Sequence, residues 1–237
     1  MRNVRAAAAA LAAATLLGAG NAASILDSYR DALAKLHSPP FMEFAYTVTR
    51  SGPSRIVTEQ HQVYWAASGV ERNDTIEING TRVVPAPTQV IHRDAWPYDP
   101  AQFAVSPDDY DAAPAGMALV AGHATYAFTL TRSSPADFVL KSLYVDVRRR
   151  LPVRQTFAVA GADCEGAGEI NFGPVGGYWL PTFVSVACTQ TGTDASPPPV
   201  FKESIRFSNY QFPASIPADV FVQPSSSAGY ESSPGGP

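Results

Sequence analysis

Hydrophobic residues recur at helical spacing near the beginning of the chain, over residues 24–37. Ser24 stands where an N-cap belongs, and the proline pair that begins at Pro39 cannot continue a helix. The apolar positions of this segment are Ile25, Tyr29, Leu33 and Leu36. Their 3.6-residue period predicts one amphipathic helix with a single apolar stripe.

Beyond this helix the hydrophobic period changes to two, which is the period of a strand with one buried face. Turn residues separate the runs, and the Asn79-Gly80 pair is a strong hairpin signal. The predicted strands cover residues 42–49, 55–65, 70–78, 82–85, 117–120, 125–131, 138–147, 153–160, 169–172, 178–189 and 200–207. About ten strands in sequence-adjacent meanders favour a mainly β protein, in which a curved antiparallel sheet forms an incomplete, half-open barrel, over a two-sheet sandwich.

Residues 86–115 interrupt this alternation. Prolines punctuate the segment, and no hydrophobic period persists along it. Its aromatic residues are Trp96, Tyr98, Phe103 and Tyr110. We expect loops and short helical turns here, packed by these rings into a helix or loop lid over the sheet.

The two ends of the chain have the composition of processed or unstructured segments. Residues 1–23 combine two arginines, an uncharged run over 6–18 and small residues, which is typical of a secretory signal cleaved after Ala22 or Ala23. An uncleaved N-terminal anchor is the alternative. Residues 224–237 consist mainly of Ser, Pro and Gly and are expected to be disordered. A single domain over 24–223 remains, in a periplasmic or secreted protein.

The two cysteines, Cys164 and Cys188, are expected to form a disulfide in an oxidising compartment. Antiparallel pairing around Gly176 would place Phe172 opposite Leu180 and Cys164 directly opposite Cys188. A bulge among the nearby glycines would shift that register. Neither cysteine lies directly after the expected cleavage point, where the acceptor of a lipid anchor would stand. A lipid-anchored form is therefore not expected.

Charge and motifs argue against several classes of function. Loss of residues 1–23 removes two arginines and changes the formal charge from −4 to −6, which disfavours nucleic acid as a partner. The four histidines have no metal-ligand spacing, and no Gly-x-Ser-x-Gly elbow is present. The acidic residues between Asp108 and Asp111 fit a solvated loop better than a cation site. We therefore expect neither catalysis nor a metal or cofactor.

The second half of the chain contains a series of short motifs in a recognisable order. They are Val120–His123 before Tyr126–Leu130, Leu143–Asp146 before Leu151–Arg154, Trp179–Pro181, Ile205–Tyr210 and Pro217–Phe221. Their order resembles that of the outer-membrane lipoprotein-sorting superfamily, which comprises periplasmic lipoprotein carriers with lipoprotein-receptor and anti-sigma-regulator relatives. The resemblance covers residues 24–222. Phe44-Ala45-Tyr46 stands in place of the Phe-x-Gln pattern of typical carriers, which leaves the cargo open.

The resemblance implies a half-open barrel whose concave side is apolar, lidded by helices and able to take up acyl chains without bond chemistry. It further implies a monomeric, soluble carrier of a lipid, a lipoprotein acyl chain or another hydrophobic ligand, with a membrane donor or acceptor complex as a further partner. An envelope sensor or regulatory interaction module of the same fold is the alternative. The expected ligand-binding residues, each equally suited to an ordinary core, are Phe44, Tyr46, Trp65, Trp96, Tyr126, Phe128 and Tyr144.

Overall fold

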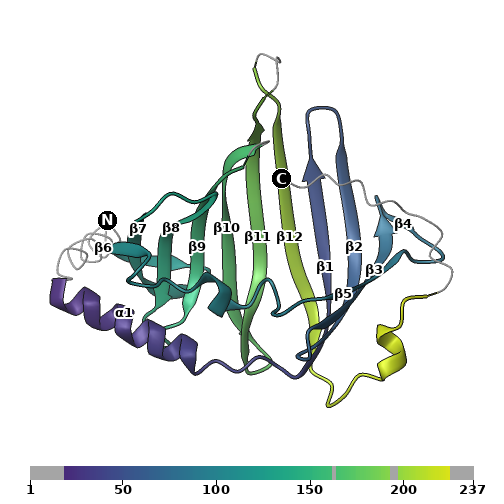
Figure 1. Ribbon diagram of the computed structural model, residues 1–237, viewed down its shortest axis with the longest axis horizontal. Helices are drawn as coiled ribbons and strands as arrows, with labels where there is room; N and C mark the ends of the chain where they lie inside the picture. Colours follow the sequence, from purple (N-terminus) through teal and green to yellow (C-terminus); the bar gives the residue numbers. More distant parts are fainter. Residues whose placement is uncertain (1–18, 162–163, 193–196, 225–237) are drawn as a thin grey trace, which may run out of the picture.

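One open, twelve-stranded antiparallel sheet dominates the protein (Figure 1). The computed structural model describes residues 19–161, 164–192 and 197–224. The elements are α1 (Ala19–Ala34), β1 (Phe41–Ser51), β2 (Ile56–Ala66), β3 (Val70–Ile78), β4 (Thr81–Arg82), β5 (Thr88–His92), β6 (Tyr110–Val120), β7 (His123–Arg132), β8 (Phe138–Asp146), β9 (Pro152–Ala160), β10 (Cys164–Val175), β11 (Tyr178–Gln190) and β12 (Val200–Gln211), with 3₁₀ turns at Pro100–Phe103 and Ala218–Phe221.

The sheet joins two meanders along a single seam. Strands β1 to β4 form one meander and β6 to β12 the other, and β1 pairs with β12 to give the order β4-β3-β2-β1-β12-β11-β10-β9-β8-β7-β6. Strand β5 pairs with β3 beside β4. Within the described residues the two end strands do not pair with each other, so the sheet stays open. The predicted half-open antiparallel barrel is confirmed.

Helix α1 begins earlier than its sequence pattern predicted. It covers Ala19–Ala34, so Ser24 lies inside the helix and is not its N-cap. Of the predicted apolar stripe, Ile25, Tyr29 and Leu33 are buried, whereas Leu36 lies beyond the end of the helix and is half-buried. The helix extends through the expected cleavage point because Ala22 also packs into the core. The rest of the predicted signal, residues 1–18, lies outside the described residues, as does the tail from 225.

The segment over residues 93–109, here called the strap, runs from β5 to β6 across the same face of the sheet on which α1 lies (Figure 1). We call this covered face the inner face. The prediction of loops and turns over 86–115 was wrong at both ends, where the chain forms β5 and the first half of β6. The first half of β6 was missed because Pro114 argues against a strand at this position. Proline is accommodated here because β6 is an edge strand and Pro114 lies at a bulge.

The hairpin of β10 and β11 forms the predicted disulfide with a different register. Cys164 and Cys188 are bonded, with a Cα–Cα distance of 5.5 Å. However, Gly173 opposes Leu180, and a further shift beyond Asn171 places Cys164 opposite Gln190. The bridge is therefore diagonal. The register predicted from the sequence was wrong because the two-residue turn and the bulge each shift the pairing by one residue. A total shift of two residues leaves both cysteines on the same face of the sheet, so the disulfide still forms.

The Asp146 carboxylate organises the turn between β8 and β9. It accepts hydrogen bonds from the backbone N–H groups of Arg148 at 2.8 Å and Arg149 at 2.6 Å, and it contacts Nδ1 of His123 at 2.9 Å. Burial by itself raises the pKa of this carboxyl group, but the hydrogen bonds outweigh burial, and the pKa lies below its ordinary value of 3.8. The turn is thus stabilised by the charged form.

The Asp146→Asn variant is expected to lower the free energy of unfolding by about 1–3 kcal/mol at neutral pH, because buried donors lose a charged acceptor. Since the folded pKa lies below the unfolded one, this stabilisation is complete above the unfolded pKa and disappears as the pH falls through the folded pKa. Urea denaturation of both proteins across the acid range measures the difference, with exposed Asp108→Asn as the control. A difference that stays constant with pH would contradict this role.

Candidate functional site

A continuous row of side chains crosses the inner face from β7 to β1. The strand registers place Phe128 beside Leu143, and Leu143 in turn beside Gln155. The row continues through Ile170, Val184, Ile205 and Val48. Apart from Gln155 these residues are hydrophobic. The inner face is therefore apolar along most of its width.

The strap covers this row with its own aromatic residues. The ring centroid of Trp96 lies 5.7 Å from that of Phe44, and Tyr98 lies 5.1 Å from Phe207. Farther along, the ring centroid of Phe103 lies 6.1 Å from that of Phe172. These are edge-on or tilted contacts, each contributing about 0.5–1.5 kcal/mol beyond the area that it buries.

Few polar contacts attach the strap to the rest of the molecule. The side chain of Gln155 donates a hydrogen bond to the carbonyl of Phe103 at 2.7 Å, and Ser38 donates one to Asp99 at 2.6 Å. From α1, Arg30 donates to the carbonyl of Val105 at 3.2 Å. No disulfide links the strap to the sheet, because the two cysteines are bonded to each other at the end of β10 and β11 that lies away from their turn. The cover is held by packing and a small number of hydrogen bonds.

A cavity of about 150 Å³, partly open to solvent, remains between the strap and the β1–β3 end of the sheet. Its aromatic walls come from both the strap and the strands. The lining residues are Phe44, Tyr46, Val63, Glu71, Asn73, Gln89, Ile91, Arg93, Trp96, Pro97, Tyr98, Ile205 and Phe207. A cavity of this size holds a compound as small as benzene, so a long acyl chain does not fit while the strap is in place.

Glu71 and Arg93 give the cavity one charge of each sign. Glu71 is only 7% exposed, opposite Trp65 in the ladder, and its Oε2 lies 3.6 Å from Nε of Arg93. Burial raises the pKa of the Glu71 carboxyl group, and Arg93 lowers it by a smaller amount. The ion pair thus compensates only part of the desolvation of this carboxylate.

A polar network behind the cavity orients its tyrosine. Asn73 donates to the hydroxyl of Tyr46 at 2.6 Å, and its Oδ1 lies 2.9 Å from Nδ1 of His61. The imidazole stacks on the Tyr46 ring with centroids 4.5 Å apart. Burial lowers the pKa of His61, so the ring is neutral at neutral pH. Arg50 completes the network by bridging Glu59 and Glu203.

The network does not have the geometry of a metal site. No group of three or more His, Cys, Asp or Glu side chains in the described ranges is arranged to hold an ion. His61 Nε2 is buried and lies 3.4 Å from Glu59 without a hydrogen bond. These residues therefore position Tyr46 and fill space.

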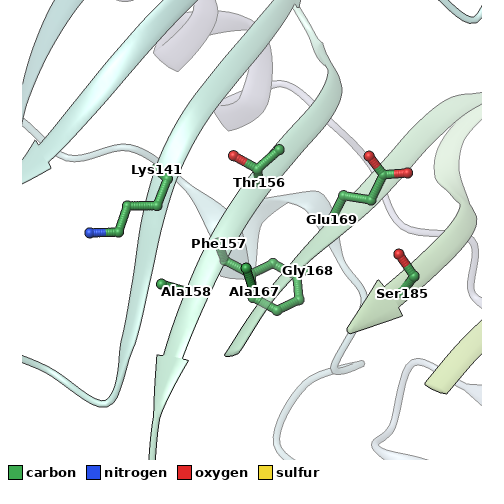
Figure 2. A pocket seen from close by; sticks show the side chains of 8 residues that line it. All are labelled: Lys141, Thr156, Phe157, Ala158, Ala167, Gly168, Glu169 and Ser185. Carbon is green, nitrogen blue, oxygen red and sulfur yellow. The ribbon is translucent and has the colours of Figure 1, made fainter. Parts of the chain in front are cut away.

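A larger hollow, of about 590 Å³, lies elsewhere on the sheet, over β8 to β11 (Figure 2). Glu169 pairs with Thr156 and with Ser185, and this set alternates with Ile170 and Val184, so it belongs to the outer face. In Figure 2, the ammonium group of Lys141 extends away from Glu169. The hollow is wide open, and among the described residues no segment covers it as the strap covers the inner face. We therefore place the candidate site on the inner face.

The structure distributes the residues predicted for ligand binding over three places. Phe44, Tyr46 and Trp96 line the cavity, and Trp65 is buried beside them. Phe128 is buried at the other end of the inner face, where Tyr126 packs in part against the same core. Tyr144 also packs in part against this core, but it alternates with Leu143 along β8, and this alternation places it on the outer face.

The sequence analysis missed Glu71, Asn73 and Arg93. A signal for the first two was present, because Val70–Ile78 is a strand in which charged or polar residues occupy both alternating sets. A strand without an apolar face is unusual in a half-buried sheet. Arg93 carried no such signal, since only the path of the strap brings it to Glu71.

Comparison with known proteins gives likeness in structure alone. The sequence matches no protein-family model and no curated protein. Solved structures do match, among them an outer-membrane lipoprotein-sorting domain from Vibrio parahaemolyticus (TM-score 0.46, 11% identity, 85% of this chain and 97% of that chain covered). A DUF1329 family protein from Desulfovibrio piger gives 0.44 at 10% identity, covering 84% of this chain and 96% of that chain.

A LolA superfamily protein from Nitrosomonas europaea is also similar, with a TM-score of 0.41 at 14% identity, covering 85% of this chain and 97% of that chain. Its description and that of the Vibrio domain name the superfamily that the sequence resembles. The likeness concerns the fold, so the ligand has to be argued from the residues of this chain.

Proposed function

We propose that the protein is a carrier that works outside the cytoplasm and binds a lipid, a lipoprotein acyl chain or another hydrophobic ligand on its inner face, without bond chemistry. One observation carries the proposal. The apolar inner face is covered by an irregular strap and one helix, and not by a second sheet. Such a cover can be displaced without breaking the sheet, whereas a sandwich core cannot be opened in this way.

Uptake of an acyl chain requires the strap to move, because the cavity measures only about 150 Å³. Removing Trp96, Tyr98 and Phe103 from their contacts costs roughly 1.5–3 kcal/mol for each fully exposed side chain. A buried chain gains about 0.8 kcal/mol per CH₂ group, so ten such groups contribute about 8 kcal/mol. The two terms are comparable, which is what reversible loading and release need.

The location outside the cytoplasm rests on residues 1–23 and on the bond between Cys164 and Cys188. Disulfides persist in oxidising compartments and are rare elsewhere. Among the described residues, no helix has both the length and the apolar composition needed to cross a membrane. We further propose that the carrier is a monomer, exchanging its ligand with a membrane donor or acceptor complex.

The test is displacement of a hydrophobic fluorescent dye by fatty acids of increasing length. We expect saturable displacement whose affinity rises about tenfold for each pair of added CH₂ groups that becomes buried. The matched variants are Tyr126→Ala on the inner face and Tyr144→Ala on the outer face. The first should weaken fatty-acid binding about three- to tenfold, and the second should leave it unchanged.

Two outcomes would count against the carrier. If no apolar ligand displaces the dye, and native mass spectrometry finds no co-purifying lipid, the inner face is an ordinary core and the sensor module becomes the better hypothesis. If Tyr144→Ala weakens binding as much as Tyr126→Ala, the ligand lies outside the strap-covered face.

A further inference from the structure

We infer that the cavity between the strap and β3 is a binding site for a small zwitterion, with the ammonium group held inside against Glu71 and the anionic group outside against Arg93. The ammonium phosphodiester headgroup of a phospholipid has this chemistry, and so does a free zwitterionic solute. The inference rests on the proposed function in one respect, because both place a ligand on the inner face beneath the strap.

The aromatic walls of the cavity suit an organic ammonium group. Five rings line it, two from the strap and three from the sheet, and they are Phe44, Tyr46, Trp96, Tyr98 and Phe207. The faces of aromatic rings carry partial negative charge, and cages of such rings are the usual protein site for quaternary ammonium groups. A desolvated contact of this kind contributes about 2 kcal/mol or more. Aliphatic walls would enclose the same volume without this attraction.

Glu71 supplies a charged counterpart inside these walls. Its side chain is nine-tenths buried, and its one ion pair, to Arg93, is 3.6 Å long, beyond ordinary hydrogen-bond distance. Tyr46 and Tyr98 line the same cavity, and the charge of the Glu71 carboxylate contributes to the raised pKa of both tyrosines. Burial is the larger cause of the raised pKa in both tyrosines, and it takes that of Tyr98 to about 12. A cationic ligand would balance the part of the negative charge on Glu71 that Arg93 leaves uncompensated.

Arg93 supplies the opposite charge at the opening. Its side chain is 38% exposed, in contrast to Glu71, so it reaches from the cavity to solvent. Its backbone N–H is bonded to the carbonyl of Gly69 at 2.7 Å, which holds the base of the strap beside β3. A guanidinium group has several N–H donors, and an anionic oxygen can bind those that Glu71 leaves free.

The sum of the charges selects a zwitterion over either simple ion. The cavity lining carries one negative charge on Glu71 and one positive charge on Arg93. His61, behind Tyr46, is neutral because burial lowers its pKa. A lone cation would meet Arg93 and a lone anion would meet Glu71, each a like-charge contact. A ligand with both charges meets a complementary group at each end.

The volume of the cavity agrees with this ligand. Its 150 Å³ matches a compact group of about six heavy atoms, by comparison with a cavity of that size that binds benzene. The choline or ethanolamine end of a headgroup is of this size, and its phosphate would remain at the opening beside Arg93. A headgroup in this position directs the attached acyl chains along the strap-covered face.

The experiment is calorimetric titration of the full chain with phosphocholine, choline chloride and inorganic phosphate. Phosphocholine is expected to bind at least tenfold more tightly than either single ion. The Glu71→Gln variant should lose at least tenfold in phosphocholine affinity while its melting temperature stays equal or rises, because a buried and only partly compensated charge is removed and the 38% exposed Arg93 keeps its hydration. The matched control is Glu77→Gln, on the same strand but outside the cavity.

A second variant tests the role assigned to Arg93. Arg93→Gln should reduce the advantage of phosphocholine over choline to less than about twofold, since only the contact to phosphate is lost. Glycerophosphocholine and a short-chain phosphatidylcholine distinguish the two sources of ligand. Much tighter binding of the chain-bearing compound identifies a lipid headgroup, and equal binding identifies a free zwitterion.

Absence of saturable phosphocholine binding would overturn the inference, as would unchanged affinity in Glu71→Gln. Either result is distinct from failure of the carrier, because displacement of dye by fatty acids does not depend on Glu71. If fatty acids bind and phosphocholine does not, the carrier stands and the headgroup site fails. If phosphocholine binds and fatty acids do not, the headgroup site stands and the carrier fails.

Discussion

Replacing Trp96 by alanine is expected to lower the free energy of unfolding by about 3–5 kcal/mol and, at the same time, to strengthen the binding of apolar ligands. Trp96 is 5% exposed and is the strap residue that packs on both Phe44 and Tyr98. Its removal destabilises the closed strap more than the open one. Ligand affinity then rises, because less free energy is spent on opening.

The size of this gain follows from the coupling between opening and binding. Each 1.4 kcal/mol removed from the cost of opening raises the apparent affinity about tenfold. We therefore expect at least a fivefold gain in fatty-acid affinity, measured by dye displacement, together with a lower midpoint in urea denaturation.

A matched control is present in the same core. Trp65 is 3% exposed and belongs to the same hydrophobic cluster, but it lies on β2 and not on the strap. Trp65→Ala should lose comparable stability without a gain in ligand affinity, since it does not release the cover selectively. Equal changes in affinity in both variants would show that the strap does not gate the inner face.

Removal of the disulfide is expected to have the next largest effect on stability. The double variant Cys164→Ala, Cys188→Ala should lose about 3 kcal/mol, which is the loop-closure entropy for a sequence separation of 24. Reduction of the wild-type protein should have a similar effect. Urea denaturation with and without a reducing agent measures both.

The double variant also serves as its own control, since a reducing agent should not change its stability. The β10–β11 hairpin pairs the same stretch of chain through its backbone hydrogen bonds, independently of the bond. A loss below about 1 kcal/mol would mean that the hairpin, and not the bond, orders the far end of these strands. Ligand affinity should change little, because the bond does not touch the strap.

Among the buried polar side chains of the inner face, two that oppose stability are connected with the strap. The Gln155 side chain is fully buried, and its Oε1 has no hydrogen-bond partner while its amide group holds the carbonyl of Phe103. Glu71 is buried with only a distant ion pair. Groups that disfavour folding locally tend to lie at functional sites. Here they lie where the strap meets the sheet.

Local periodicity predicted the parts of the fold that depend on neighbouring residues. The part of the apolar stripe that lies within the helix is buried as expected, and β3 covers the predicted residues Val70–Ile78. The period of two identified most other strands, and the number and adjacency of the strands predicted an open, curved sheet. Cys164 and Cys188 were correctly paired, because alternation placed them on one face whether or not the register moved by two residues.

The tertiary structure alone decided the features that depend on distant segments. The sequence indicates which residues alternate along a strand. A bulge, however, shifts the pairing of all residues beyond it, and bulges depend on packing against other strands. For the same reason, alternation could not say that Tyr144 faces outward while Tyr126 faces inward. Nor could it bring Arg93 to Glu71, since only the path of the strap across the sheet creates that contact.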